Sequence, residues 1–178
     1  MQKKTLAIFD FDGTIANLQI DWKKLKKTIG SIVGLKKEHT SFATQIASIR
    51  KNNLKLYIQK IKPIIKKYEK EGIQNVTFNP KIVKLINKYP KTAILSNNYK
   101  ETILTALSKV SLNIMPDIII GFDDVSNPKP SPDGILEIIR LMKVNKNNVI
   151  LYGNSWMDKK AGRLAKVKTI LIEKNNDN

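Results

Sequence analysis

Five short apolar runs, each bounded by polar residues or glycine, constrain the fold of this chain more than any other feature. They lie at Thr5–Phe9, Thr92–Leu95, Asp117–Gly121, Asn148–Gly153 and Lys168–Ile172. Apolar runs of this length are typical of strands that are buried on both faces, as strands of parallel sheets are. The pattern therefore predicts a buried parallel sheet.

Helical patterns separate the later runs. Apolar residues recur at intervals of three and four within Pro80–Tyr89, Lys100–Val110 and Asp133–Met142. Asn79 and Ser131 each precede a proline at the start of such a pattern, which is a helix start signal. The alternation of strand and helix predicts an α/β fold, with right-handed crossovers and helices on both faces of a parallel sheet.

The segment from about residue 20 to about residue 71 has no strand-like run. Apolar residues recur there at helical spacing, as in Trp22, Leu25 and Ile29. We expect roughly four helices, inserted after the first strand. The predicted division is a core of residues 1–16 and 77–178 and a small all-helical insertion of residues 17–76.

Charge is concentrated in that insertion. The 178-residue chain has a formal net charge of +17, and residues 17–75 hold 14 basic and 4 acidic residues. The excess indicates either the solvated faces of amphipathic helices or a surface for an anionic ligand or nucleic acid. Nucleic acid is the less favoured partner, because Trp22, Phe42, Tyr57 and Tyr68 fall mostly at core-facing positions.

Several classes of site are excluded by composition. The chain has no cysteine, so it has no disulfide and no thiolate metal site, and His39 is its single histidine. A Ser-His-Asp triad would need His39, which lies in a segment expected to connect helices. No apolar run of about 18 residues occurs. We expect a cytoplasmic protein with one main core and no membrane partner, either a monomer or a homodimer.

The first predicted strand ends in F-D-F-D-G-T. Residues two apart in an extended chain face the same side, so Asp10 and Asp12 are able to point into one cleft. Ligands of open α/β sheets bind at the carboxyl ends of the strands. The alternative is an Asp-x-Asp-Gly turn that only ends the strand.

Three later runs also end near polar residues. Ser96 and Asn97 follow the second run, and their hydroxyl and backbone N–H groups are suited to phosphate oxygens. Lys129 lies between two prolines, which suits an ammonium aimed at a fixed anion. Asn154 and Asp158 follow the fourth run. Taken singly, these features are equally consistent with a turn or with a rigid loop that carries a solvated lysine.

Together, these residues resemble the four motifs of the haloacid dehalogenase-like hydrolase superfamily. The resemblance rests on Asp10-Phe-Asp12-Gly-Thr, Ser96, the proline-flanked Lys129, and Gly153-Asn154-Ser155 with Asp158, in that order. The helical insertion lies where the phosphoglycolate-phosphatase-like members carry a helical cap. The resemblance implies a Rossmann-like core with that cap acting as a lid.

The resemblance also implies the role of each residue. Asp10 is expected to be the nucleophile of a phosphatase, and Asp12 the general acid and base. Ser96, Asn97 and Lys129 are expected to bind phosphate. Mg²⁺ is the expected cofactor, held by Asp10, Asp12, Asn154 and Asp158. The list of implied substrates is short: a small phosphorylated metabolite, either phosphoglycolate-like or a sugar phosphate.

Asn154 departs from the pattern, because members of this superfamily usually have an aspartate there. An amide oxygen is able to coordinate Mg²⁺ but brings no negative charge, so we expect weaker metal binding. Three explanations stay open: a natural variant that tolerates weak binding, an introduced substitution that slows turnover, or a member that has lost catalysis. In the last case the protein binds an anionic partner or nucleic acid through its basic cap.

Overall fold

The computed structural model describes residues 5–35, 41–109 and 116–172. Its main sheet has five parallel strands in the order β5-β4-β1-β6-β7. The strands are β1 (Leu6–Phe9), β4 (Lys91–Leu95), β5 (Ile118–Ile120), β6 (Val149–Gly153) and β7 (Lys168–Leu171). The predicted parallel sheet is confirmed, and each predicted run contains one of these strands or overlaps it to within a residue.

The register of β1 explains why the predicted site residues meet. Leu6 pairs with Lys91 of β4 on one side and with Val149 of β6 on the other. All three strands run in the same direction, so their carboxyl ends lie at one edge of the sheet. Asp10 extends this ladder by donating its N–H to the carbonyl of Tyr152 at 2.8 Å.

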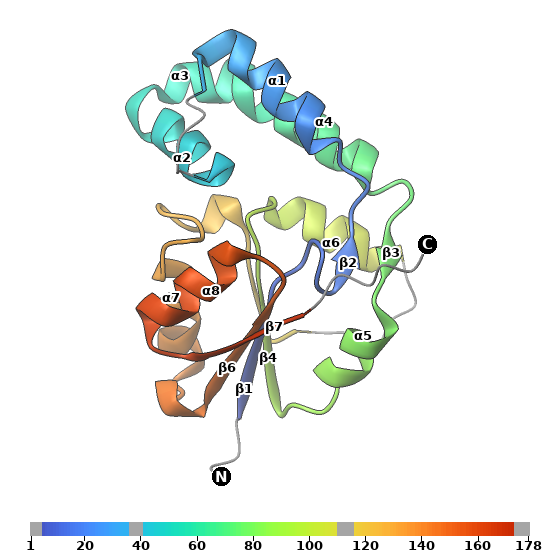
Figure 1. Ribbon diagram of the computed structural model, residues 1–178, viewed down its shortest axis with the longest axis vertical. Helices are drawn as coiled ribbons and strands as arrows, with labels where there is room; N and C mark the ends of the chain where they lie inside the picture. The colour runs from blue at the N-terminus through green and yellow to red at the C-terminus, as the bar shows by residue number, and fades with distance from the viewer. Residues whose placement is uncertain (1–4, 36–40, 110–115, 173–178) are drawn as a thin grey trace.

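Helices cover both faces of the sheet (Figure 1). They are α5 (Pro80–Ile86), α6 (Lys100–Ser108), α7 (Asp133–Met142) and α8 (Trp156–Ala165). Alternate residues of β1 face opposite sides of the sheet. Ala7 and Phe9 pack in the hydrophobic cluster that includes α5 and α6, whereas Leu6 and Ile8 pack in the one that includes α7 and α8. The Rossmann-like α/β fold is thus confirmed, although the periodicity did not predict α8.

The predicted helical insertion is confirmed. In the parts of it that the structure describes, residues 17–35 and 41–76, the α-helices are α1 (Trp22–Val33), α2 (Phe42–Asn52), α3 (Leu54–Leu56) and α4 (Lys62–Gly72). The π-helical turn η1 (Tyr57–Ile61) joins α3 to α4 without a break. Pro63 lies at the start of α4. Proline has no N–H to donate, and this missing donor accounts for the change from α-helical to π-helical hydrogen bonding beside it.

The inserted helices lie above the carboxyl edge of the sheet (Figure 1). A short antiparallel ladder of β2 (Ala16–Asn17) and β3 (Thr77–Phe78) stands at the two ends of the insertion. Sequence periodicity did not predict this ladder, because two residues are too few to show alternation. We call α1 to α4 the cap, and its proposed boundaries at 17 and 76 fall in or beside these two strands.

Two short 3₁₀ turns complete the described elements, η2 (Phe122–Asp124) after β5 and η3 (Lys146–Asn148) before β6. Within the described residues, no helix has both the length and the apolar content that a membrane crossing requires. His39 and Val110, which figured in the sequence predictions, lie outside the described residues.

Candidate active site

Lys129 lies between two buried carboxylates at the carboxyl edge of the sheet. Its Nζ donates to Oδ1 of Asp10 at 2.6 Å and to Oδ1 of Asp158 at 2.5 Å. The side chains of Lys129, Asp10 and Asp158 are only 4%, 9% and 0% exposed. The sequence separation is large, but the structure brings these three predicted residues together as one ionic cluster.

Burial affects the three groups of this cluster differently. It raises the pKa of Asp10 to about 7, even though the attraction of Lys129 opposes it. Burial also favours the neutral form of Asp158, but the charge of Lys129 and the hydrogen bonds from Lys129 and Ser155 together outweigh it and lower the pKa of that carboxyl. In the same way, the two carboxylates overcome burial and raise the pKa of Lys129. The lysine is therefore charged, and Asp158 is its better-stabilised partner.

Asp158 is fixed on both of its oxygens. Oδ1 accepts from Lys129, and Oδ2 accepts from the N–H and the hydroxyl of Ser155 at 3.0 and 2.5 Å. Ser155 is the N-cap of α8, so a helix capping box holds the acid in place. A Cβ at Gly153 would come within 2.4 Å of Asp158. These contacts position Lys129, and the predicted metal role of Asp158 stays a prediction.

Asp12 has a different environment from Asp10. Its Oδ1 accepts from the N–H of Leu18 at 2.9 Å, which orients the carboxylate in the turn after β1. The second oxygen of Asp10, Oδ2, accepts from the hydroxyl of Thr14 at 3.3 Å. Both aspartates line the same cavity. The predicted juxtaposition of Asp10 and Asp12 is therefore present in the structure.

Ser96 and Asn97 also line this cavity at the end of β4. The hydroxyl of Ser96 donates to Oδ1 of Asn98 at 2.9 Å. Asn97 makes a reciprocal pair with the backbone of Lys129, donating Nδ2–H to its carbonyl and accepting its N–H, both at 3.0 Å. Asn97 thus holds the loop that carries Lys129. The predicted phosphate contacts of Ser96, Asn97 and Lys129 stay predictions.

The chemistry of the donor set allows a test of whether Mg²⁺ fits. Asp10, Asp12 and Asn154 line one cavity, and their oxygens are the kind of ligand that Mg²⁺ prefers. A Cβ at Gly13 would meet the amide nitrogen of Asn154 at 1.8 Å, so the glycine makes room for this side chain. No group of three or more acidic, histidine or cysteine side chains arranged for a metal occurs within the described residues. Oxygen atoms of Asp10, Asp12 and Asn154 fit Mg²⁺ by their chemistry, and an amide at position 154 brings less negative charge than an acid there would.

The cavity has a volume of about 440 Å³. Its floor is the carboxyl edge of the sheet, and its other wall comes from the cap. The cap residues that line it are Trp22, Lys26, Ser41, Phe42, Ala43, Ile46, Ile65 and Glu69. Because both parts of the chain contribute, the cavity is enclosed only while the cap lies on the core.

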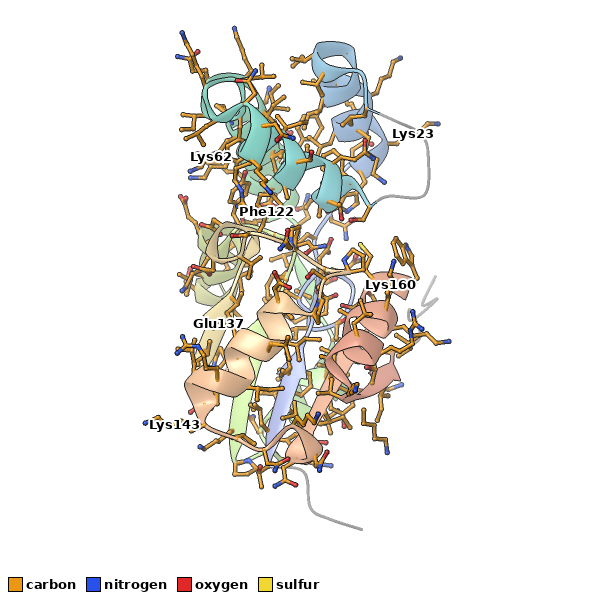
Figure 2. The ribbon with its side chains drawn as sticks, turned by 90° about the vertical axis from the view of Figure 1, so that its left-hand side faces the viewer. Lys23, Lys62, Phe122, Glu137, Lys143 and Lys160 are labelled. Atoms are coloured by element: carbon orange, nitrogen blue, oxygen red, sulfur yellow. The ribbon has the colours of Figure 1, made fainter. Side chains whose placement is uncertain are left out.

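Contacts between cap and core hold this arrangement. Arg50 of α2 donates to the carbonyls of Phe122 at 3.0 Å, Ser126 at 3.2 Å, and Val125. The guanidinium also lies 4.6 Å from the centre of the Phe122 ring. Figure 2 shows Phe122 at the level where cap and core meet. Sequence reasoning assigned no role to Arg50, since it sits among the exposed basic residues of an amphipathic helix.

Glu69 of α4 is the second such contact and was also missed. It is 1% exposed and accepts from Nδ2 of Asn98 at 3.0 Å, from the N–H of Tyr99 at 3.3 Å, and from the hydroxyl of Thr102. Burial raises its pKa to about 7. Asn98 also bonds Ser96, so a chain of hydrogen bonds connects the cap to the predicted phosphate site.

Comparison with known families agrees with the fold and the motif order. The model of the family described as haloacid dehalogenase-like hydrolase matches residues 7–172. The chain belongs to this family. The matched region includes both the core and the cap of this haloacid dehalogenase-like hydrolase.

Among its curated relatives is the pyrophosphatase PpaX of Listeria welshimeri, which is 34% identical over 79 residues. That stretch is 44% of this chain and 36% of the Listeria protein, so the match spans about a third of the relative's length. The putative pyrophosphatase PpaX of Caldanaerobacter subterraneus is 23% identical over 96% of this chain and 82% of its own length. The phosphoglycolate phosphatase of Aquifex aeolicus is 25% identical over 92% of this chain and 82% of its own.

Solved structures support the haloacid dehalogenase-like fold. A putative haloacid dehalogenase-like hydrolase from Bacteroides fragilis has a TM-score of 0.67 and 24% identity, covering 94% of this chain and 86% of the other. A putative phosphoglycolate phosphatase from Lactobacillus plantarum has a TM-score of 0.66 and 18% identity over the same shares. Likeness at this level of identity supports the fold alone.

Proposed function

We propose that this chain is a Mg²⁺-dependent phosphatase that hydrolyses a small phosphorylated metabolite through an aspartyl-phosphate on Asp10. The observation that carries the proposal is a buried carboxylate, bonded to Lys129 at 2.6 Å, in a cavity shared with Asp12 and Ser96. Several relatives are named as a phosphatase or a pyrophosphatase, which points to the same reaction class.

Asp10 supplies the nucleophile in the first step. Lys129 occupies Oδ1, so Oδ2, which accepts from the Thr14 hydroxyl at 3.3 Å, is the oxygen that attacks phosphorus. The new bond joins Oδ2 to phosphorus while the bond from phosphorus to the leaving oxygen breaks. Asp12 gives its proton to that leaving oxygen, which departs as an alcohol.

Water completes the reaction in the second step. Asp12, now ionised, takes a proton from water as the water oxygen attacks phosphorus. The bond between phosphorus and Asp10 breaks, so the carboxylate of Asp10 returns and inorganic phosphate leaves. The N–H of Leu18 at 2.9 Å keeps the Asp12 carboxylate in one orientation through both steps.

Charge is the main obstacle to this chemistry, because a phosphate dianion is repelled by carboxylates. Lys129 offsets part of the charge and is itself held by Asp158. Mg²⁺, when bound, supplies further positive charge beside the phosphoryl oxygens. The side chains of Asp10 and Asn154 and the carbonyl of Asp12 would hold it, and Asp158 would act on the site indirectly, from behind Lys129.

The alternative is a binding protein of impaired catalysis that engages an anionic partner through its basic cap. Two observations favour it: Asn154 lowers the charge of the metal site, and most cap lysines are exposed. Figure 2 shows Lys23 of the cap pointing away from the molecule. The buried cluster of Asp10, Lys129 and Asp158 favours catalysis, because a surface binding site does not need it.

Hydrolysis of ethyl phosphate in a Mg²⁺ titration tests the proposal. We expect turnover that rises with Mg²⁺ and falls by about 10³-fold or more in Asp10→Asn, since the amide is a poor nucleophile. Glu137→Gln is the matched control, a carboxylate-to-amide change on the outer face of α7 (Figure 2). The proposal is wrong if Asp10→Asn turns over as fast as the unchanged protein.

A further inference from the structure

Aromatic side chains gather around the cavity to an unusual degree. The chain has two tryptophans, and both line it: Trp22 from the start of α1 in the cap and Trp156 from the start of α8 in the core. Phe42, Tyr99 and Phe122 line it as well. Aromatic rings bury large apolar areas and prefer edge-to-face or offset stacking with other rings.

The cap wall of the cavity is mainly apolar. Trp22 and Phe42 meet edge to face, with ring centres 6.3 Å apart and planes at 72°. Ala43, Ile46 and Ile65 continue this surface. Of the basic residues of the cap that the structure describes, Lys26 alone lines the cavity, and it is exposed. The excess charge of the cap therefore lies largely outside the cavity.

The core wall of the cavity adds the ring of Trp156, whose position is not explained by packing in the protein interior. Trp156 is 53% exposed although it lines the cavity, at the first position of α8. A large apolar side chain left accessible beside a polar site is typical of a ligand-binding surface. The polar residues of the cavity cluster instead at the ends of the strands, around Asp10 and Lys129.

Small substrates that are polar throughout form few favourable contacts with apolar walls of this kind. Pyrophosphate and phosphoglycolate both carry a second anionic group away from the reacting phosphorus. In this cavity the second anionic group would face the apolar cap wall and the buried carboxyl of Glu69. The described part of the cap would offer it one cation, Lys26, which lies at the exposed rim. A cavity of about 440 Å³ is also larger than these ligands require, since it falls in the range of sites for drug-sized molecules.

We propose that the physiological substrate is a phosphate monoester whose leaving alcohol carries an uncharged aromatic ring, packed against Trp22 and Phe42 of the cap and Trp156 of the core. The inference rests on the proposed phosphatase function and adds its substrate class. The phosphate lies at Asp10 and Lys129, and the ring fills the apolar part of the cavity. Burial of the ring closes the cap over the reacting group, which excludes water.

Two esters with matched leaving groups test the inference. Ethyl phosphate and 2-phenylethyl phosphate both release a primary alcohol, so the ring is their main difference. We expect kcat/KM at saturating Mg²⁺ to be about 10- to 100-fold higher for the phenylethyl ester, the usual effect of burying a ring of this size. Phosphoglycolate and pyrophosphate should both fall below the phenylethyl ester.

Single-residue variants test which side chains cause the preference for the phenylethyl ester. Trp156→Ala is the main one, because its exposed side chain makes truncation safe for the fold, and it should reduce the preference for the phenylethyl ester at least threefold. Trp22→Ala should reduce it further. Lys160→Met, an exposed change on α8 away from the residues that line the cavity, is the control and should leave the ratio unchanged. A ratio near one in the unchanged protein, or a preference for phosphoglycolate or pyrophosphate, overturns the inference while the phosphatase function stands.

Binding gives a readout that does not depend on turnover. Both tryptophans line the cavity, so tryptophan fluorescence should change when a non-hydrolysable phosphonate binds. 2-Phenylethylphosphonate should bind at least tenfold more tightly than ethylphosphonate, and Trp156→Ala should reduce that difference. If neither ester is hydrolysed, the phosphatase function fails, and the two phosphonates still decide the ring site: equal affinities overturn it.

Discussion

Two buried acidic sites in this protein solve the same physical problem in different ways. At the edge of the sheet, Asp10 and Asp158 share the ammonium of Lys129. Under the cap, Glu69 is 1% exposed and is held by the neutral donors of Asn98, Tyr99 and Thr102. At the first site a cation helps to lower the pKa of Asp158 and partly offsets burial at Asp10, whereas at the second site only neutral donors offset burial.

The difference indicates what each site is suited for. A lysine held between two acids provides a fixed positive charge, which a phosphoryl-transfer site needs. Glu69 joins the cap to the core, and its raised pKa of about 7 allows it to be neutral near physiological pH. The first site therefore favours chemistry on an anion, and the second favours attachment of the lid.

Removal of the shared cation should have the largest effect. Lys129→Met removes the cation that two buried carboxylates share, so we expect the free energy of unfolding to fall by about 3–5 kcal/mol at pH 7. Activity should fall by about 10³-fold if the lysine stabilises the transition state. Urea denaturation and steady-state kinetics measure the two effects. Lys160→Met, an exposed change on α8, is the control, and equal behaviour of both variants would contradict the role of Lys129.

The pH dependence of Glu69 should come next. Its native pKa of about 7 lies above the ordinary 4.5, so the native state binds the proton more tightly than the unfolded chain. Glu69 therefore contributes stability at low pH that is lost as pH rises from about 4.5 to about 7.

Glu69→Gln isolates that contribution. The amide brings two hydrogens to a site whose neighbours are donors, whereas the protonated carboxyl brings one, so the variant should lose about 1–3 kcal/mol of stability at pH 5. The loss should shrink as the pH rises to 8, because only the unchanged protein has a carboxyl to ionise there. Urea denaturation at several pH values measures both proteins. A loss that is constant over this range would show that Glu69 does not titrate as described.

Adding an acid at position 154 should have a smaller effect than the changes at Lys129 and Glu69. Asn154→Asp adds a negative charge beside Asp10 and Asp12, so the Mg²⁺ concentration for half-maximal stabilisation in thermal unfolding should fall about tenfold. Without Mg²⁺, the added repulsion should lower the melting temperature. Gly13 leaves room for either side chain, since the two are alike in size. Identical Mg²⁺ dependence in both proteins would argue against Asn154 as a ligand.

Regular patterns made the core predictable. The bounds of α7, Asp133–Met142, were predicted as observed because its apolar spacing is regular, although the N-cap is Pro132 rather than the expected Ser131. The motif residues at the ends of β1, β4 and β6 were predictable for a similar reason: parallel strands bring their carboxyl ends together. Helix α8 was missed, since its short residues Ala161, Gly162 and Ala165 give a weak apolar pattern.

The contacts between cap and core were not predictable from the sequence. Glu69 lies in K-K-Y-E-K-E-G, which has the composition of an exposed helix end, and Arg50 lies in a similarly basic stretch. Their partners are 29 to 76 residues away, so no local spacing indicates them. The aromatic lining of the cavity was hidden in the same way, because Trp22 and Phe42 fall at ordinary core spacing.

The central place of β1 has a consequence for how the chain folds. β1 is first in the sequence but pairs with β4 and β6, and the ion pair of Asp10 with Lys129 spans 119 residues. Such long-range pairing slows folding and depends on late segments. During synthesis, Asp10 and the two edges of β1 therefore stay unpaired until most of the chain has been made. We expect premature chains that end before β6 to depend on chaperones, because β1 would lack one neighbour of the sheet.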